Sequence, residues 1–235
     1  MRTLALICIL ILISTLAMTA ETTLVKATPE ITYTNPIWSP NGKSIAYVGV
    51  SPGDQAGGIY LATLAGAWKN KLIIKNAGFP VWSPDGKRLA FRNGGLAIMD
   101  LAAGKSGVKR GGSYYPLIWS PNGRYILYSD EVTTAIMDTK TGKSSPAGDE
   151  SVWMADGKLL TSVSGDLQVL DPATGKSRIV AKGINAKRPF VPKGASYAWV
   201  WITENAPKGE GIYRVDLKTG SLVKQIGVRA KALYW

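Results

Sequence analysis

The stretch PIWSPNGKSIAY at residues 36–47 returns along the chain in altered copies. They are PVWSPDGKRLAF (80–91), LIWSPNGRYILY (117–128), SVWMADGKLLTS (151–162) and the fainter PFVPKGASYAWV (189–200). In the clearest copies an apolar run ends in Trp, Ser-Pro-Asn/Asp-Gly follows, and a second run resumes. Proline is preset for the second position of a type I turn, and glycine accepts the positive φ that closes it. Each copy therefore predicts a strand, a tight turn and a second strand.

The turn glycines set the repeat length. They are Gly42, Gly86, Gly123, Gly157 and Gly194, at spacings of 44, 37, 34 and 37 residues. A second phrase recurs between them, an apolar strand that ends in Asp before a Gly turn: LAIMDLAAGK (96–105), TAIMDTKTGK (134–143), LQVLDPATGK (167–176) and IYRVDLKTG (212–220). A further short strand after each of these turns completes four strands in about 40 residues, which is typical of a β-propeller blade.

Two residue types in these phrases have expected local roles. The Asp residues should accept backbone N–H groups within their own turns; they are Asp100, Asp138, Asp171 and Asp216. The repeated Trp residues should pack in the core between blades, because large rings fill that space; they are Trp38, Trp82, Trp119 and Trp153.

Together the two phrases resemble the blades of the TolB-like, WD-repeat-like (PD40-type) β-propeller family. The resemblance covers about residues 22–235 and implies an all-β fold of four-stranded antiparallel blades, usually six in a ring. It also implies a periplasmic or cell-surface scaffold. Because propellers host many unrelated activities, the resemblance is specific for fold and weak for function.

The number of blades has two interpretations. Five complete blades are predicted, TTLVK (22–26) resembles a lone fourth strand, and KALYW (231–235) resembles a lone first strand. The favoured interpretation is a six-bladed ring that lacks part of its last blade. The other is a five-bladed ring with frayed ends.

The beginning of the chain predicts export. Residues 1–20 combine a basic start, an apolar run and small residues, as in a secretory signal peptide, with cleavage as late as residue 27. An uncleaved membrane anchor is the alternative, but the apolar run is shorter than the ~20 residues of a membrane span. We expect one propeller domain over 21–235 in the periplasm or outside the cell. The only cysteine, Cys8, lies within the signal, so no disulfide is expected.

Charge and composition limit the function. With 28 Lys and Arg against 16 Asp and Glu, the formal net charge is +12, and it is +11 without Arg2. Such a charge attracts anionic proteins, polymers or lipid surfaces, although a passive basic surface is an equal alternative. Nucleic acid is disfavoured by the export signal. The chain has no histidine, which excludes a Ser-His-Asp triad and His-ligated metal sites. We expect no catalytic residue, metal or cofactor.

Blade topology predicts where a partner would bind. The turns joining strands one to two and three to four share one face of the ring, and the other connections share the opposite face. We expect the fourth-to-first connections, near the axis, to form a basic, aromatic mouth, with Tyr33 and Phe79 among its aromatics. Arginine and aromatic residues are typical interface anchors. The candidate binding residues are Lys109, Arg110, Tyr114, Tyr115, Lys187, Arg188 and Lys231.

Two functional classes remain open. The favoured one is an exported, non-enzymatic scaffold that presents its loops to a protein or an anionic polymer. The alternative is a propeller hydrolase of the lactonase or glycosidase type, which would use carboxylates with or without calcium. A cluster of convergent carboxylates in the axial channel would favour the hydrolase.

Overall fold

The computed structural model describes residues 32–50, 57–65, 67–130, 132–148, 150–203, 207 and 209–227. In this part of the chain the regular elements are twenty β-strands, and none is a helix. They form five sheets of four strands each, in which every strand pairs antiparallel with its neighbours in the chain. The prediction of an all-β propeller with five complete four-stranded blades is confirmed. No helix among the described residues is long and apolar enough to cross a membrane.

The blades follow one another along the chain. Blade I contains β1 (Thr32–Trp38), β2 (Ser44–Val50), β3 (Gly58–Ala65) and β4 (Ala67–Lys75). Blade II contains β5 (Gly78–Trp82), β6 (Arg88–Arg92), β7 (Gly95–Asp100) and β8 (Lys105–Gly111). Blade III contains β9 (Tyr115–Trp119), β10 (Tyr125–Ser129), β11 (Thr134–Asp138) and β12 (Ser144–Pro146). Blade IV contains β13 (Glu150–Trp153), β14 (Leu159–Val163), β15 (Asp166–Asp171) and β16 (Lys176–Ala181). Blade V contains β17 (Ala186–Phe190), β18 (Tyr197–Ile202), β19 (Gly211–Asp216) and β20 (Leu222–Gly227).

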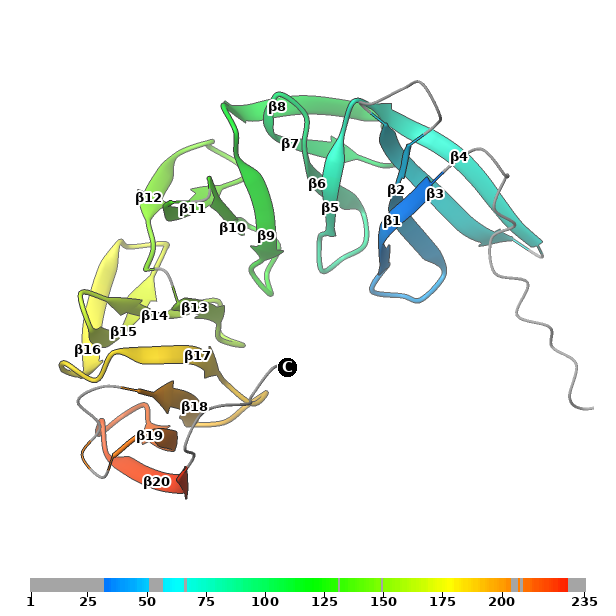
Figure 1. Cartoon of the computed structure of the whole chain (residues 1–235). Helices are drawn as coiled ribbons and strands as arrows, with labels where there is room; N and C mark the ends of the chain where they lie inside the picture. The colour runs from blue at the N-terminus through cyan, green and yellow to red at the C-terminus, as the bar shows by residue number, and fades with distance from the viewer. Residues whose placement is uncertain are drawn as a thin grey trace, which may run out of the picture.

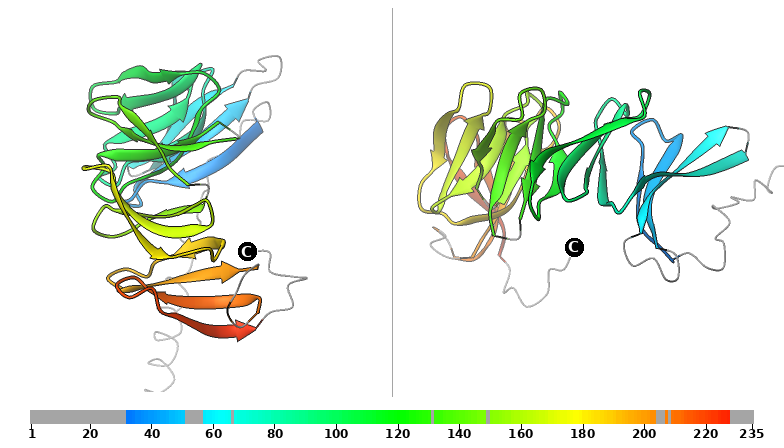
Figure 2. Two further views of the ribbon diagram at one scale, coloured as in Figure 1. Left: turned by 90° about the vertical axis from the view of Figure 1, so that its left-hand side faces the viewer. Right: turned by 90° about the horizontal axis from the view of Figure 1, so that it is seen from above.

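The five blades are arranged in an arc, with blade I at one end and blade V at the other (Figure 1). The first strand of each blade lies on the inner side of the arc and the fourth on the outer side, and Figure 2 shows the same succession of sheets from two other directions. The predicted signal peptide and the two predicted lone strands, 22–26 and 231–235, lie outside the described residues.

The core is divided among the junctions between blades. One cluster joins Ala46 and Ile59 of blade I to Leu89 and Phe91 of blade II, and these four side chains are almost fully buried. Equivalent clusters join blades II and III, III and IV, and IV and V. Apolar burial of this kind is the main favourable term in folding. Each blade is therefore stabilised chiefly by its neighbours in the sequence.

The predicted hairpin turns are present. In blade II the amide of Gly86 donates to the carbonyl of Ser83 at 2.9 Å, and the Ser83 hydroxyl donates to the Asp85 carboxylate at 2.6 Å. The turn glycines all have positive φ: Gly42 (69°), Gly86 (67°), Gly123 (67°), Gly157 (84°) and Gly194 (76°). The turns between third and fourth strands also form as predicted, because Asp100, Asp138, Asp171 and Asp216 each accept a backbone N–H at 2.9 Å.

The repeated Trp residues connect successive blades. The indole N–H of Trp82 donates to the Ile37 carbonyl at 3.2 Å, that of Trp119 to Val81 at 3.1 Å, and that of Trp153 to Ile118 at 3.4 Å. In each case the acceptor is the residue that precedes the Trp position of the previous blade. The expectation of a core role is confirmed for Trp119 and Trp153, which are buried.

For Trp38 the expectation of a core role is wrong, because this side chain is 57% exposed. Blade I is the first of the described blades, so no described blade precedes it to cover this ring.

Candidate functional site

The predicted binding residues fall into two groups. Lys109 and Arg110 lie in β8, Tyr114 lies in the connection to β9, and Tyr115 begins β9. The second group, Lys187 and Arg188, lies in β17 of blade V. Blade IV stands between the two groups along the arc (Figure 1). The seventh residue, Lys231, lies outside the described residues.

The position of Lys109 and Arg110 differs from the expected loop near the axis. Both belong to β8, the outermost strand of blade II. Leu96 pairs with Arg110 and Ala97 with Val108, so Lys109 is the extra residue of a β-bulge. A bulge redirects a side chain at a sheet edge. The fourth strand therefore continues through the residues that the sequence had suggested as loop.

The Arg110 side chain lies against two tyrosines. Its guanidinium carbon is 4.8 Å from the Tyr114 ring centroid and 5.7 Å from that of Tyr128. Its Nη2 also donates to the Tyr114 hydroxyl at 3.4 Å. This hydrogen bond, with Tyr128, raises the pKa of Arg110 above its already high ordinary value. Arg110 is exposed, so its position over the rings presents a fixed cation to solvent.

The tyrosines beneath Arg110 are held by the core. Tyr128 is 2% exposed and packs edge-on against Tyr114, with ring centroids 5.3 Å apart. Tyr128 belongs to the cluster shared by blades II and III. The cation therefore rests on a rigid support rather than on a mobile loop.

A second aromatic pair adjoins the first, since Tyr114 and Tyr115 are consecutive. Phe79 of β5 stacks on Tyr115 with centroids 5.5 Å apart and planes inclined by 30°. Phe79 is 46% exposed and has a φ of +55°. We call Phe79, Arg110, Tyr114 and Tyr115 the blade II–III surface. It combines one supported arginine with the exposed Phe79 and the half-buried Tyr115, and arginine and aromatic residues are the types that anchor interfaces.

The conformation of Phe79 belongs to a repeated feature that was not predicted from the sequence. Asn35, Phe79 and Arg188 have φ values of +52°, +55° and +46°, and each precedes a proline. Each lies at a register shift in the first strand of its blade. All three are exposed, on strands at the inner side of the arc. The X-Pro pairs inside the first strands were the available signal, because proline there interrupts a regular ladder.

Arg188 is held by blade IV through its backbone. Its amide donates to the Glu150 carboxylate at 2.9 Å, so the bulge in β17 is tied to β13. The side chain of Arg188 lines an apolar hollow of about 600 Å³ on blade V, together with Phe190 and Trp199. Lys187 is exposed and pairs in register with Trp201.

Tyr33, which was expected among the aromatics of the mouth, packs within blade I instead. Its ring meets those of Tyr47 and Tyr60 edge-on, with centroids 5.1 and 6.3 Å away. Tyr47 is buried, and its hydroxyl donates to the side-chain oxygen of Asn70. Burial raises the pKa of Tyr47 to about 12. This cluster is part of the core and not of the candidate surface.

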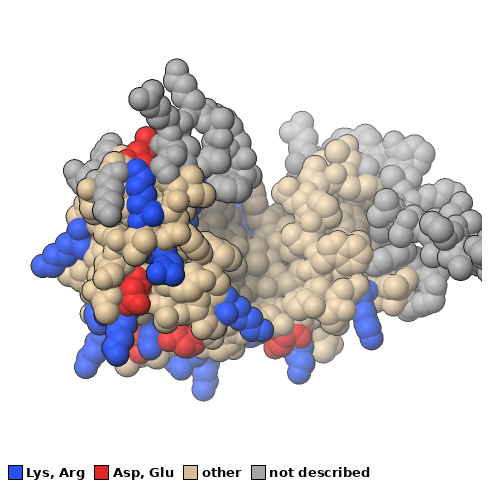
Figure 3. Space-filling model, turned by 90° about the horizontal axis from the view of Figure 1, so that it is seen from below, with Lys and Arg blue, Asp and Glu red and all other residues tan. Residues whose placement is uncertain are grey.

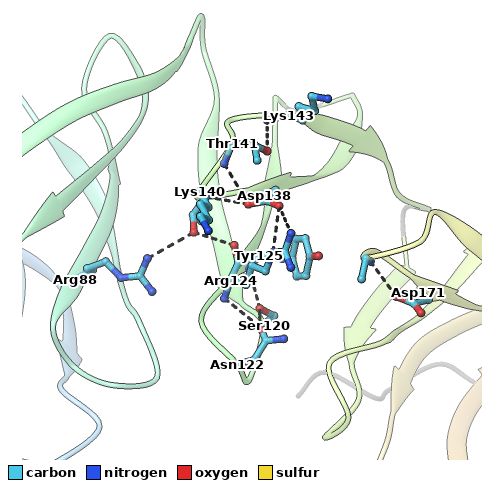
Figure 4. A network of polar contacts seen from close by, with 12 residues as sticks. Arg88, Ser120, Asn122, Arg124, Tyr125, Asp138, Lys140, Thr141, Lys143 and Asp171 are labelled. Atoms are coloured by element: carbon cyan, nitrogen blue, oxygen red, sulfur yellow. Dashed lines mark hydrogen bonds and ion pairs between the residues drawn. The ribbon is translucent and has the colours of Figure 1, made fainter.

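Two cations of the hairpin turns form ion pairs with acidic side chains. Arg124 pairs with Asp138 at 2.9 Å, and Lys158 pairs with Asp156 at 3.1 Å. Figure 4 shows the network around Arg124 and Asp138, in which the Lys140 and Thr141 amides also donate to Asp138. Burial raises the pKa of Asp138, but these hydrogen bonds outweigh it and bring the pKa below its usual value.

The space-filling view shows how charge is distributed on one side of the molecule (Figure 3). Lysines and arginines alternate with a few acidic groups along the rim, while the visible wall of the hollow enclosed by the arc is mostly uncharged. Among the described residues no three Cys, Asp or Glu side chains gather as a metal site requires.

Comparison with known proteins finds solved structures with a similar fold. No protein-family model matches the chain, and no curated protein matches it. The β-propeller domain of the Trilobed protease from Pyrococcus furiosus is 18% identical with a TM-score of 0.57, over 84% of this chain and 72% of that one. A puromycin-hydrolyzing peptidase from Mycobacterium tuberculosis is 16% identical with a TM-score of 0.55, over 86% and 39%. TolB from Acinetobacter baumannii is 21% identical with a TM-score of 0.45, over 81% and 56%.

At this level of identity the solved structures show a shared fold alone. The fold they share with the chain is the β-propeller. The chain spans 56% of the TolB structure and 39% of the peptidase, so the activities of those proteins do not follow from the likeness.

Proposed function

We propose that this β-propeller is a non-enzymatic binding scaffold whose blade II–III surface contacts an anionic protein or polymer. The observation that carries the proposal is the exposed Arg110 guanidinium, supported by Tyr114 and Tyr128 beside the stacked Phe79–Tyr115 pair, of which Phe79 is exposed. An arginine that is already oriented loses little conformational freedom on binding, which favours affinity. Its planar fork matches carboxylate, sulfate or phosphate oxygens.

The charges of the described residues support an anionic partner. Both ion pairs found among these residues involve turn cations, and neither includes Arg110, Lys187 or Arg188. With a formal net charge of +12, the whole chain also attracts anions over a distance. The blade II–III surface would then supply the local contact once an anion has approached.

The proposal includes export of the chain to the periplasm or the extracellular space. It rests on the predicted signal sequence in residues 1–20. Partners outside the cytoplasm include acidic proteins and acidic polysaccharides, and no transmembrane segment is expected after cleavage.

The binding proposal is tested with variants that each lose two positive charges. One replaces Lys109 and Arg110 with Ser, a second replaces Lys187 and Arg188, and a control replaces Lys43 and Lys87 in the hairpin turns. All six side chains are exposed. The probe is immobilised dextran sulfate, eluted over a salt series, because screening shortens from about 10 Å at 0.1 M salt to about 3 Å at 1 M.

We expect the Lys109→Ser, Arg110→Ser protein to elute at clearly lower salt than the control. Phe79→Ser in the wild-type background should lower retention without any change of charge. Equal elution of all three double variants would mean that net charge alone causes retention, and it would contradict a specific surface.

The competing function is a propeller hydrolase that uses carboxylates, with or without calcium. The structural likeness to a protease's propeller domain and to a peptidase is the reason to test hydrolase activity. Purified protein should be assayed on lactone, glycoside and peptide substrates, with and without calcium. Turnover that follows the protein through purification would contradict the non-enzymatic proposal, whatever the outcome of the dextran sulfate experiment.

A further inference from the structure

Blade V has one face that no described blade covers. Along β18, Ala198, Val200 and Ile202 are buried and belong to the cluster shared with blade IV. The alternate residues Tyr197, Trp199 and Trp201 lie on the opposite face and are only partly buried. Because successive strand residues point to opposite sides, this second face is turned away from blade IV.

The uncovered face is hollowed and apolar. Its hollow of about 600 Å³ is lined mainly by Phe190, Trp199, Trp201, Ile212 and Ile226. Phe190 is 59% exposed and Ile226 is 54% exposed. A contiguous exposed patch of large apolar residues marks a surface that another segment or molecule covers.

One polar atom on this face lacks a partner. The indole Nε1 of Trp201 is buried and makes no hydrogen bond among the described residues. A buried donor is ordinarily satisfied, so whatever covers the face should bring an acceptor. An extended peptide segment offers a backbone carbonyl at every residue.

The junctions between other blades show which residue follows such a face. In blades II, III and IV the incoming first strand carries a Trp whose indole donates to the previous blade. The acceptors are the carbonyls of Ile37, Val81 and Ile118, each one residue before the Trp position of its blade. The matching carbonyl of blade V belongs to Phe190, since Val191 occupies the Trp position.

The spacing of these Trp residues identifies a candidate for the next position. Trp82, Trp119 and Trp153 follow the end of the preceding fourth strand, at Lys75, Gly111 and Pro146, by 7, 8 and 7 residues. Trp235 follows Gly227, the end of β20, by 8 residues. The segment 228–235, VRAKALYW, therefore carries an indole in register with the repeat.

We propose that residues 228–235 cover the open face of blade V as an incoming first strand, with the Trp235 indole donating to the Phe190 carbonyl. In this arrangement Trp235 fills the hollow, and the extended segment offers carbonyls to the Trp201 indole. A tethered segment has a high effective concentration at its site, which favours it over a second copy of the chain. The proposal concerns the fold of this face and is independent of the blade II–III surface.

Limited trypsin digestion tests the proposal, because the segment contains two cleavage sites, Arg229 and Lys231. Cleavage there is followed by mass spectrometry in the purified protein. Wild-type protein should be cut far more slowly than the free peptide VRAKALYW. Phe190→Ser and Trp235→Ala should each speed cleavage by about tenfold, since proteolysis tracks the population of the open state.

The matched control is Phe79→Ser, which replaces another exposed Phe of an inner strand outside this face. Its cleavage at Arg229 and Lys231 should equal that of wild type. Trp235→Phe keeps an aromatic ring but loses the indole N–H donor. A cleavage rate between those of wild type and Trp235→Ala would support the hydrogen bond to the Phe190 carbonyl, and a wild-type cleavage rate would overturn that hydrogen bond.

Two results would overturn the proposal as a whole. One is cleavage of the wild-type segment as fast as the free peptide. The other is protection that grows with protein concentration, which would identify a second copy as the occupant. Both are independent of anion binding, so they leave the proposed function to its own test.

Discussion

Single residues at the hairpin turns contribute to the stability of each blade. At Gly86 a Cβ atom would meet only the Cδ of Pro40, 3.6 Å away, which is an ordinary contact. A Cβ atom would therefore fit at this position. Glycine is required instead by the φ of +67°, because residues with a Cβ are strained in that region.

Gly86→Val should therefore destabilise the protein more than Lys87→Ala does. We expect the valine to reduce the free energy of unfolding by about 1–3 kcal/mol, the range for such backbone strain. Lys87 is exposed, and its loss should change that free energy by less than about 0.5 kcal/mol. Thermal melts of both variants measure the difference, and equal melting temperatures would contradict a strain-controlled turn.

Asp85 in the same turn gives a prediction for pH. Its carboxylate accepts from the Ser83 hydroxyl at 2.6 Å and from the Lys87 amide at 3.1 Å. The bond from Ser83 is the main reason that the pKa of Asp85 lies below its ordinary value of 3.8. A carboxyl with a lowered folded-state pKa stabilises the fold above its unfolded pKa, and this contribution is lost as the pH falls.

Asp85→Asn keeps the side-chain oxygen, as Asn41 and Asn122 do in blades I and III, where it accepts at equivalent positions. The variant should lose less stability than wild type when the pH falls below about 4. Asp85→Ala should have a lower free energy of unfolding than wild type at every pH, by about 0.5–1.5 kcal/mol for a lost hydrogen bond. Urea unfolding across a pH series checks both; identical acid sensitivity of wild type and Asp85→Asn would exclude this role.

At the scale of strands, the sequence predicted what repeats and missed what departs from the repeat. The hairpins and Asp turns were predictable because their chemistry is local and occurs in register several times. The bulge at Lys109 was not, since it depends on how β8 pairs with β7. The exposure of Trp38 was also hidden, because it depends on which blades lie beside blade I. Consequently the prediction placed in one mouth residues that the structure places in two groups, on blades II–III and on blade V.

The Trp residues test whether burial, which differs between equivalent positions of the repeat, determines their contribution to stability. Trp119 is 3% exposed, donates to Val81 and lies beneath the Arg88 guanidinium, whereas Trp38 is 57% exposed. Trp119→Phe should reduce the free energy of unfolding by about 1–3 kcal/mol, because the carbonyl of the partly buried Val81 loses its indole donor. Trp38→Phe should cost less than about 0.5 kcal/mol. Denaturant titration separates the two; comparable losses would show that burial does not distinguish them.

For the whole molecule, the first prediction concerns export and the cleavage of the predicted signal peptide. If residues 1–20, or as many as 27, are a cleaved signal, protein expressed in a bacterial host should begin at residue 21 to 28. N-terminal sequencing of the periplasmic fraction and the medium measures this. An intact Met1 found with the membranes would instead support the uncleaved anchor.

The junction clusters described above have a thermodynamic consequence. Within the described residues, blades II, III and IV each share a cluster with two neighbours, while blades I and V each share one. A chain of units that are coupled only to their nearest neighbours does not unfold in a single cooperative step, and local unfolding begins at its terminal units. Amide hydrogen exchange should therefore be slowest in β10 and fastest in β3 and β19. If residues 228–235 do cover blade V, exchange in β19 will slow and the local unfolding will become one-sided.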